Sequence, residues 1–170
     1  MHPAPEGANT TLYGLLVFMH IVFAVIAIGY NFAYVIWIRR GTSSPQHLDF
    51  ALRGVKFMDD YVANPCYIGA AITGFLMVFM GKPLASFLWV ALAIYFVAMG
   101  VAYGIYTPLL SRQIRVLSQQ GAESTEYQAI AARSNVIGAA MGFMVILIVA
   151  LKIFEPVFWE GTTSLRLFGS

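Results

Sequence analysis

Residues 11–38 read TLYGLLVFMHIVFAVIAIGYNFAYVIWI, contain no Asp, Glu, Lys or Arg, and are followed directly by Arg39 and Arg40. A transmembrane helix needs about 20 consecutive apolar residues. A secretory signal peptide has an apolar region of only about 7–15 residues behind a basic segment, whereas no Lys or Arg precedes this run. We therefore expect residues 11–38 to form a transmembrane helix that stays in the protein.

Three further apolar runs predict spans at about 61–80, 84–108 and 134–154. The chain is 59% hydrophobic and 11% charged, whereas soluble domains have about 45–50% apolar and about 25% charged residues. This composition excludes a soluble enzyme domain, a disordered tail and a nucleic-acid binder, which would need a basic face. We predict an all-α fold: a four-transmembrane-helix bundle forming a single domain over residues 1–170, with the lipid bilayer as its surroundings.

The basic residues predict the orientation of the spans. Seven of the ten Lys and Arg lie in two connections: Arg39, Arg40, Arg53 and Lys56 after the first span, and Arg112, Arg115 and Arg133 after the third. Short loops rich in Lys and Arg stay in the cytoplasm. We therefore expect a multi-pass protein of the bacterial inner membrane, with its N-terminus and C-terminus outside.

The first of these connections has a helical pattern of its own. Apolar residues recur on one side at Leu48, Ala51, Leu52, Val55 and Met58, and the pairs Asp49/Arg53 and Lys56/Asp60 have the i,i+4 spacing of helical ion pairs. The pattern predicts a short cytoplasmic interfacial helix between spans one and two, lying on the membrane surface. The alternative is a solvated helix without membrane contact. After the third span we expect the helix to continue to about Gly121.

Two pairs of glycines predict where spans three and four meet. Gly100 and Gly104 lie four residues apart in the third span, and Gly138 and Gly142 lie four apart in the fourth. Small residues allow membrane helices to approach closely. Both pairs fall in the inner half, so we expect the two spans to cross there. The alternative is four separate packing points.

Polar groups inside the spans are the default functional candidates, because they are unfavourable in lipid. They are His20, Asn31, Asn64, Thr73, Tyr95, Tyr103 and Asn135, with Lys152 near the outer end. We expect no buried carboxylate, because Asp59, Asp60 and Glu155 fall at span ends. No nucleophile–base set is apparent, and the single Cys66 excludes an internal disulfide. We therefore predict no catalytic residue and no metal site.

His20 is the one histidine within the apolar runs, in the outer half of the first span. Residues expected near its depth are Thr73, Met77, Tyr95, Met99 and Met144. One interpretation is a hydrogen bond to a neighbouring group such as the Tyr95 hydroxyl. The other is an axial ligand to a haem iron, with Met, water, Lys152 or another subunit as the second ligand.

The order of motifs along the chain resembles a known family. Residues 19–31 read MHIVFAVIAIGYN, and they are followed by Trp37, Arg39-Arg40, Asp60-Tyr61, Pro65, Thr73-Gly74, Leu88-Trp89 and Pro108. This series is similar to an uncharacterised bacterial family of four-helix membrane proteins, the domain of unknown function 2269. The family is distantly similar to the HemJ-type protoporphyrinogen oxidases and the CopD copper-resistance proteins. The HemJ resemblance, which extends to Lys152 and Pro156, implies a haem-ligand position at His20.

These observations favour an integral membrane protein that is an accessory or scaffold subunit of a membrane complex. Its partners would be other membrane subunits or a second copy of the chain. The residues alone imply no bound cofactor. One alternative is a redox-associated protein that binds haem b through His20. A second alternative is a CopD-like protein that handles or transports a metal.

Overall fold

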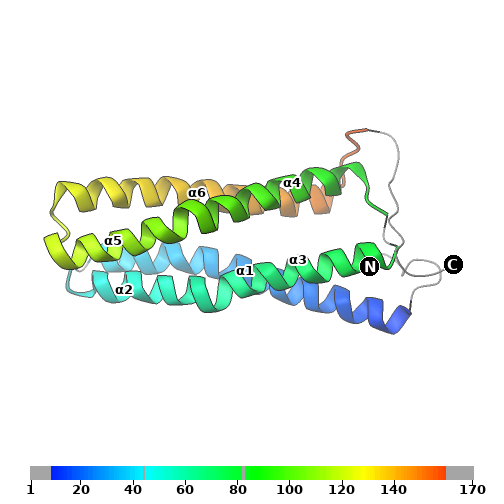
Figure 1. Cartoon of the computed structure of the whole chain (residues 1–170), viewed down its shortest axis with the longest axis horizontal. Coiled ribbons are helices and arrows are strands. Elements are labelled where there is room, and N and C mark those ends of the chain that lie inside the picture. Colours follow the sequence, from blue (N-terminus) through cyan, green and yellow to red (C-terminus); the bar gives the residue numbers. More distant parts are fainter. Residues whose placement is uncertain (1–8, 44, 82, 160–170) are drawn as a thin grey trace.

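The computed structural model describes residues 9–43, 45–81 and 83–159. Helix α1 (Thr10–Thr42) comes first. It is followed by α2 (Pro45–Met58), the π-helical turn η1 (Asp59–Ala63) and α3 (Asn64–Phe79), and these three elements form one continuous helical stretch (Figure 1). Helix α4 (Ser86–Val101), the π-helical turn η2 (Ala102–Tyr106) and α5 (Thr107–Gln120) do the same, and α6 (Thr125–Phe154) comes last. Four of these helical stretches are long and apolar enough to cross a membrane, which confirms the predicted fold class.

Local sequence accounts for the ends of the helices. The Asn9 side chain accepts from the backbone N–H groups of Thr11 and Leu12 at 3.1 Å, which caps α1. Ser124 caps α6 in the same way, at 3.2 Å from the Tyr127 N–H. Gly121 ends α5 with a φ of 81°, a conformation that glycine adopts without strain. The expected end of this helix near Gly121 is thereby confirmed.

The four long helices are longer than a bilayer requires. They contain 33, 34, 35 and 30 residues, so each is roughly 45–53 Å long, against a hydrocarbon core of about 30 Å. The expected spans at 11–38 and 134–154 lie within the first and the last of them. The expected spans at about 61–80 and 84–108 overlap the other two, which end at Phe79 and begin at Ser86. The additional turns lie at one end of the bundle, which we call the Arg-rich end: the last turn of α1, α2, α5 and the first turns of α6.

The helices pair as two hairpins (Figure 1). Helix α1 packs against α2 and α3 to form the first hairpin, and α6 packs against α4 and α5 to form the second. Spans three and four are therefore neighbours, as expected. Among the described helices, the main backbone packing between the hairpins is that of α2 against α5, at the Arg-rich end. We call the remainder of the bundle, where α3, α4 and the facing parts of α1 and α6 lie, the apolar half.

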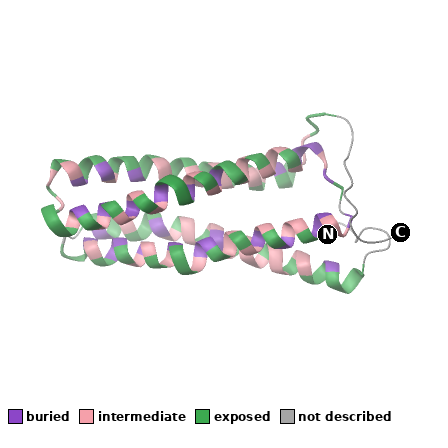
Figure 2. Cartoon of the chain, viewed as in Figure 1, coloured by how far each residue is buried: buried purple, intermediate pink, exposed green. Residues whose placement is uncertain are grey.

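The hydrophobic core lies at the Arg-rich end. Its largest fully buried side chains are Leu52, Val55 and Leu110, which come from α2 and α5. The aromatic rings of Tyr34 and Tyr127 close the same cluster from α1 and α6. In the apolar half few side chains of the apolar runs are buried and most are exposed or partly exposed, which is the distribution expected where lipid covers the protein (Figure 2).

The helix predicted between spans one and two exists, but it does not lie across a membrane surface. Helix α2 continues directly into η1 and α3 (Figure 1). The buried side chains of its predicted apolar side, including Leu48 and Leu52, pack against protein, with exposed fractions of 3% and 0%. Periodicity alone cannot distinguish these settings, because both require one apolar side.

Candidate functional site

The site begins with two prolines inside long helices, Pro65 and Pro108. A proline has no N–H, and its ring collides with the carbonyl group four residues earlier. Here the residue before each proline donates its N–H to a carbonyl five residues earlier: Asn64 to Asp59, and Thr107 to Ala102. The wider π-helical turns η1 and η2 result. Such turns are rare and are frequent at functional sites.

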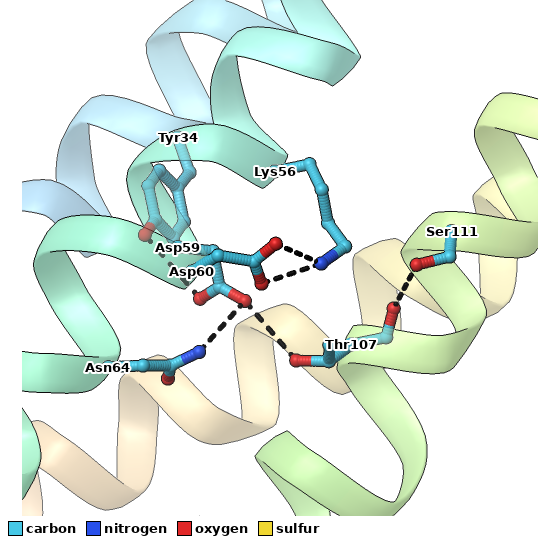
Figure 3. A network of polar contacts seen from close by, with 7 residues as sticks. All are labelled: Tyr34, Lys56, Asp59, Asp60, Asn64, Thr107 and Ser111. Carbon is cyan, nitrogen blue, oxygen red and sulfur yellow. Dashed lines mark hydrogen bonds and ion pairs between the residues drawn. The ribbon is translucent and has the colours of Figure 1, made fainter.

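The carboxylate of Asp59, in η1, links this turn to Thr107, the residue that directly follows η2 (Figure 3). Its Oδ2 accepts from the Asn64 Nδ2 at 3.3 Å and from the Thr107 hydroxyl at 3.2 Å. Its Oδ1 accepts from the Tyr34 hydroxyl at a longer 3.5 Å. We call these four residues the Asp59 junction. They come from α1, η1, α3 and α5, so the junction includes both hairpins.

The Asp59 carboxylate is buried, with 7% of the residue exposed. The neighbouring basic side chain, Lys56, bonds to Asp60 instead, with its Nζ 2.6 Å from Oδ1 (Figure 3). The three groups that donate to Asp59, from Tyr34, Asn64 and Thr107, are all uncharged. The expectation of no buried carboxylate is wrong, because the helix continues through residue 59 and the second hairpin covers it.

This arrangement acts as a clamp between the hairpins. A carboxylate can only accept hydrogen bonds, so the surrounding hydroxyl and amide groups must turn their hydrogens toward it. Hydrogen bonds to a charged group contribute about 1.5–3 kcal/mol each, and a buried group left unpaired is destabilising. The junction therefore favours one relative position of α1, η1 and α5.

His20 lies within the first hairpin, against α3. Its Nδ1 is 2.8 Å from the Ala70 carbonyl oxygen and 3.2 Å from the Thr73 hydroxyl. A Cβ at Gly74 would lie 3.4 Å from the ring Cε1. Thr73 is thus found at the expected depth. Tyr95, the neighbour named for a hydrogen bond, instead donates to the Tyr67 carbonyl at 3.1 Å.

Side chains bridge the hairpins in the apolar half. The bond from Tyr95 to the Tyr67 carbonyl joins α4 to α3. The rings of Phe75 and Phe96 join the same two helices, with centroids 6.2 Å apart. Asn31 donates to the Tyr67 hydroxyl within the first hairpin. The bridges here are long aromatic side chains, which keep the backbones of α3 and α4 apart.

The glycines behave differently from one another. Gly138 lies against the Tyr106 ring, where a Cβ would be 3.6 Å from Cε2. At Gly100, Gly104 and Gly142 a Cβ would meet no atom within 4 Å. These three glycines therefore do not bring two helices of the same chain together. The close contacts lie in the first hairpin, where a Cβ at Gly69 would be 2.8 Å from the Phe23 ring.

The remaining polar candidates lie near the surface or the ends of helices. Tyr103 and Asn135 are exposed. Lys152 pairs with Glu155, and its Nζ lies 5.3 Å from the centroid of the Phe87 ring. Within residues 9–43, 45–81 and 83–159, no group of three or more His, Cys, Asp or Glu side chains could hold a metal ion.

Sequence reasoning named Asn64 but placed its partner Asp59 at the end of a span, and it missed the other two donors to Asp59, Tyr34 and Thr107. The available signal was proline within two helical patterns, which marks a local change of hydrogen bonding. That signal predicts an irregular turn in each helix. It does not predict that the two turns lie at the same level, because this depends on how the hairpins pack.

Residues 14–156 match the family described as "Predicted integral membrane protein (DUF2269)". The chain belongs to this family. No curated protein and no solved structure matched the DUF2269 chain. Family membership and the four apolar helices together identify a multi-pass integral membrane protein. The family description states a location and no reaction.

Proposed function

We propose that this DUF2269 protein is an accessory or scaffold subunit of a membrane complex, and that its apolar half holds a partner between the two hairpins. The observation that carries this proposal is the unequal packing along the bundle. The main backbone packing between the hairpins is that of α2 against α5, at the Arg-rich end. The core cluster and the Asp59 junction reinforce this end.

The apolar half has a different construction. Its hairpins meet through the rings of Phe75 and Phe96 and through the bond from Tyr95 to the Tyr67 carbonyl. Membrane helices associate through close backbone packing and hydrogen bonds, because lipid supplies no hydrophobic driving force between them. Contact through the ends of two rings is weaker than such packing. An apolar helix of a partner subunit can replace these ring contacts with its own.

A photo-crosslinking amino acid in place of Phe96 tests this proposal in native membranes. We expect a discrete adduct between this position and one membrane protein, whose mass distinguishes another subunit from a second copy of the chain. The matched control is the same probe in place of Phe143, an exposed phenylalanine of α6. We expect lipid adducts there. The same protein adduct from both positions, or none from position 96, would overturn the proposal.

A second candidate function is binding of haem b, and the geometry of His20 favours it. Histidines that bind metals usually direct their other ring nitrogen to a carbonyl or carboxylate, which orients the ring. The contact between Nδ1 and the Ala70 carbonyl has this form. His20 would be an axial ligand, and the haem would supply one-electron transfer.

A pyridine-haemochrome assay on protein expressed with ample haem tests this candidate. If haem is bound, we expect His20→Ala to remove the Soret band and His47→Ala, a change at an exposed position of α2, to leave it. No haem in folded wild-type protein, or a Soret band that survives His20→Ala, would rule out His20 as the ligand.

A further inference from the structure

A surface groove lies where the second hairpin passes from its apolar half to the Arg-rich end. It runs between α6 and the segment formed by η2 and α5. Gly104 lies on one side of it, and a Cβ there would meet no atom within 4 Å. Pro108 and Ile137 line its apolar part, and Arg112 and Arg133 line the other part.

The order of residues along the groove follows the two helices. Gly104, Pro108 and Arg112 follow one another at intervals of four residues through η2 and α5, and all three line the groove. On α6, Arg133 precedes Ile137 by the same spacing. The groove therefore has an apolar part beside the apolar half of the bundle and a basic part beside the Arg-rich end.

The basic part carries a net positive charge. Arg112 Nη2 is 2.8 Å from Glu126 Oε1, and this pair is exposed. Arg133 is also exposed, and it forms no ion pair among the residues that the structure describes. The Arg133 guanidinium is therefore not neutralised by a carboxylate of the described residues. Arg112 still has N–H donors besides those that bond to Glu126.

We propose that this groove binds one anionic phospholipid of the adjacent leaflet. Its phosphate would lie between Arg133 and Arg112, and an acyl chain would lie along Gly104, Pro108 and Ile137. Two features of the groove match this ligand. Its basic side chains lie at the level where the apolar runs end, and the apolar part of the groove extends away from them. Basic pockets between membrane helices are known to bind anionic head groups.

Native mass spectrometry of the purified protein tests the site, with phosphatidylglycerol and phosphatidylcholine of identical acyl chains as probes. We expect phosphatidylglycerol to bind more tightly. We expect Arg133→Gln to weaken its binding about five-fold, the effect of one basic residue near an anionic head group. The charge-matched control is Arg40→Gln, an exposed arginine of α1 outside the groove, which should leave binding nearly unchanged.

Two further arms separate a lipid from a simple anion. Gly104→Phe fills the apolar part of the groove without changing the charge, so it should weaken phosphatidylglycerol binding. Gly100→Phe, one turn away, should not weaken it. Millimolar inorganic phosphate should not displace the lipid. Equal binding of the two lipids, equal losses in both arginine variants, full binding by Gly104→Phe, or displacement by phosphate would overturn the proposal. Circular dichroism confirms that each variant is folded.

Discussion

The carboxylate of Asp59 accepts a hydrogen bond from the hydroxyl of Thr107 at 3.2 Å, which joins the π-helical turn of the first hairpin to the start of α5 in the second. Both residues are placed by a proline. Thr107 directly precedes Pro108, and Asp59 is bonded through its carbonyl to Asn64, which precedes Pro65. The same local irregularity therefore brings a donor and an acceptor to one level of the bundle.

We expect Asp59→Ala to lower the free energy of unfolding by about 1–3 kcal/mol or more. The substitution leaves the buried amide of Asn64 and the hydroxyl of Thr107 without their acceptor. Asp60→Ala is the matched control, since it removes the adjacent carboxylate from a partly exposed pair with Lys56. Exposed ion pairs contribute about 0–1 kcal/mol. Unfolding in one detergent should rank the two variants, and equal losses would contradict a clamp at Asp59.

A double-mutant cycle isolates the bond between the hairpins. Asp59→Ala and Thr107→Val each remove one partner, so the double variant should be more stable than the sum of the single losses predicts. Residues in direct contact show interaction energies of about 0.5–3 kcal/mol. Strict additivity would mean that the two side chains do not interact in the folded protein.

Glycine substitutions distinguish close packing from open surface. Gly69→Leu should lower stability by about 1–3 kcal/mol, because its side chain must displace the Phe23 ring from the interface of α1 and α3. Gly100→Leu should cause no such loss, because no atom lies within 4 Å of a Cβ there. Thermal unfolding of both variants is the check. A larger loss for Gly100→Leu would place the tight packing in the second hairpin.

His20→Ala should lower the free energy of unfolding by about 0.5–1.5 kcal/mol through the lost bond between Nδ1 and the Ala70 carbonyl. His47→Ala, in an exposed position of α2, is the control and should change stability little. Urea unfolding in mixed micelles measures both. If His20→Ala is as stable as the wild type, the contact between Nδ1 and α3 does not hold α1 in place.

The four helices could be predicted from the sequence because the bilayer imposes a minimum apolar length, which residues 11–38 exceed without a charge. Basic residues such as Arg39 indicated where the apolar part ends. The position of α2 could not be predicted in this way. Its buried Leu52 would occupy the same helical position on a membrane surface or against α5, and only the partner differs.

The site was predicted only in part. Asn64 and His20 were recognised because a polar group in an apolar run is unusual, and both bond to other helices or turns in the structure. Asp59 was placed at the end of a span, since the pattern over residues 48–60 indicated a separate helix. Its burial depends on contact with Thr107, 48 residues later in the sequence. No local sequence pattern predicts that these two residues meet.

The orientation of the protein stays a prediction, and thiol labelling tests it. In a Cys66→Ser background, Thr11→Cys and Thr42→Cys place single thiols at opposite ends of α1, both in exposed positions. Seven of the ten basic residues predict that the Thr42 end faces the cytoplasm. An impermeant reagent on intact cells should label Thr11→Cys. The predicted orientation places residues 1–10 and 157–170 outside. Labelling of Thr42→Cys alone would show the opposite orientation.

The central claim is that two hairpins are joined firmly at the Arg-rich end and loosely in the apolar half. Pulsed electron-electron spin resonance in the Cys66→Ser background tests it most directly, with spin labels at Phe50 and Arg115 for the Arg-rich end and at Ile72 and Val97 for the apolar half. All four positions are exposed, so the labels should not disturb packing. In the purified protein without partners, we expect a narrow distance distribution for the first pair and a broad one for the second. Equally narrow distributions for both pairs would show a closed four-helix bundle and would contradict the claim.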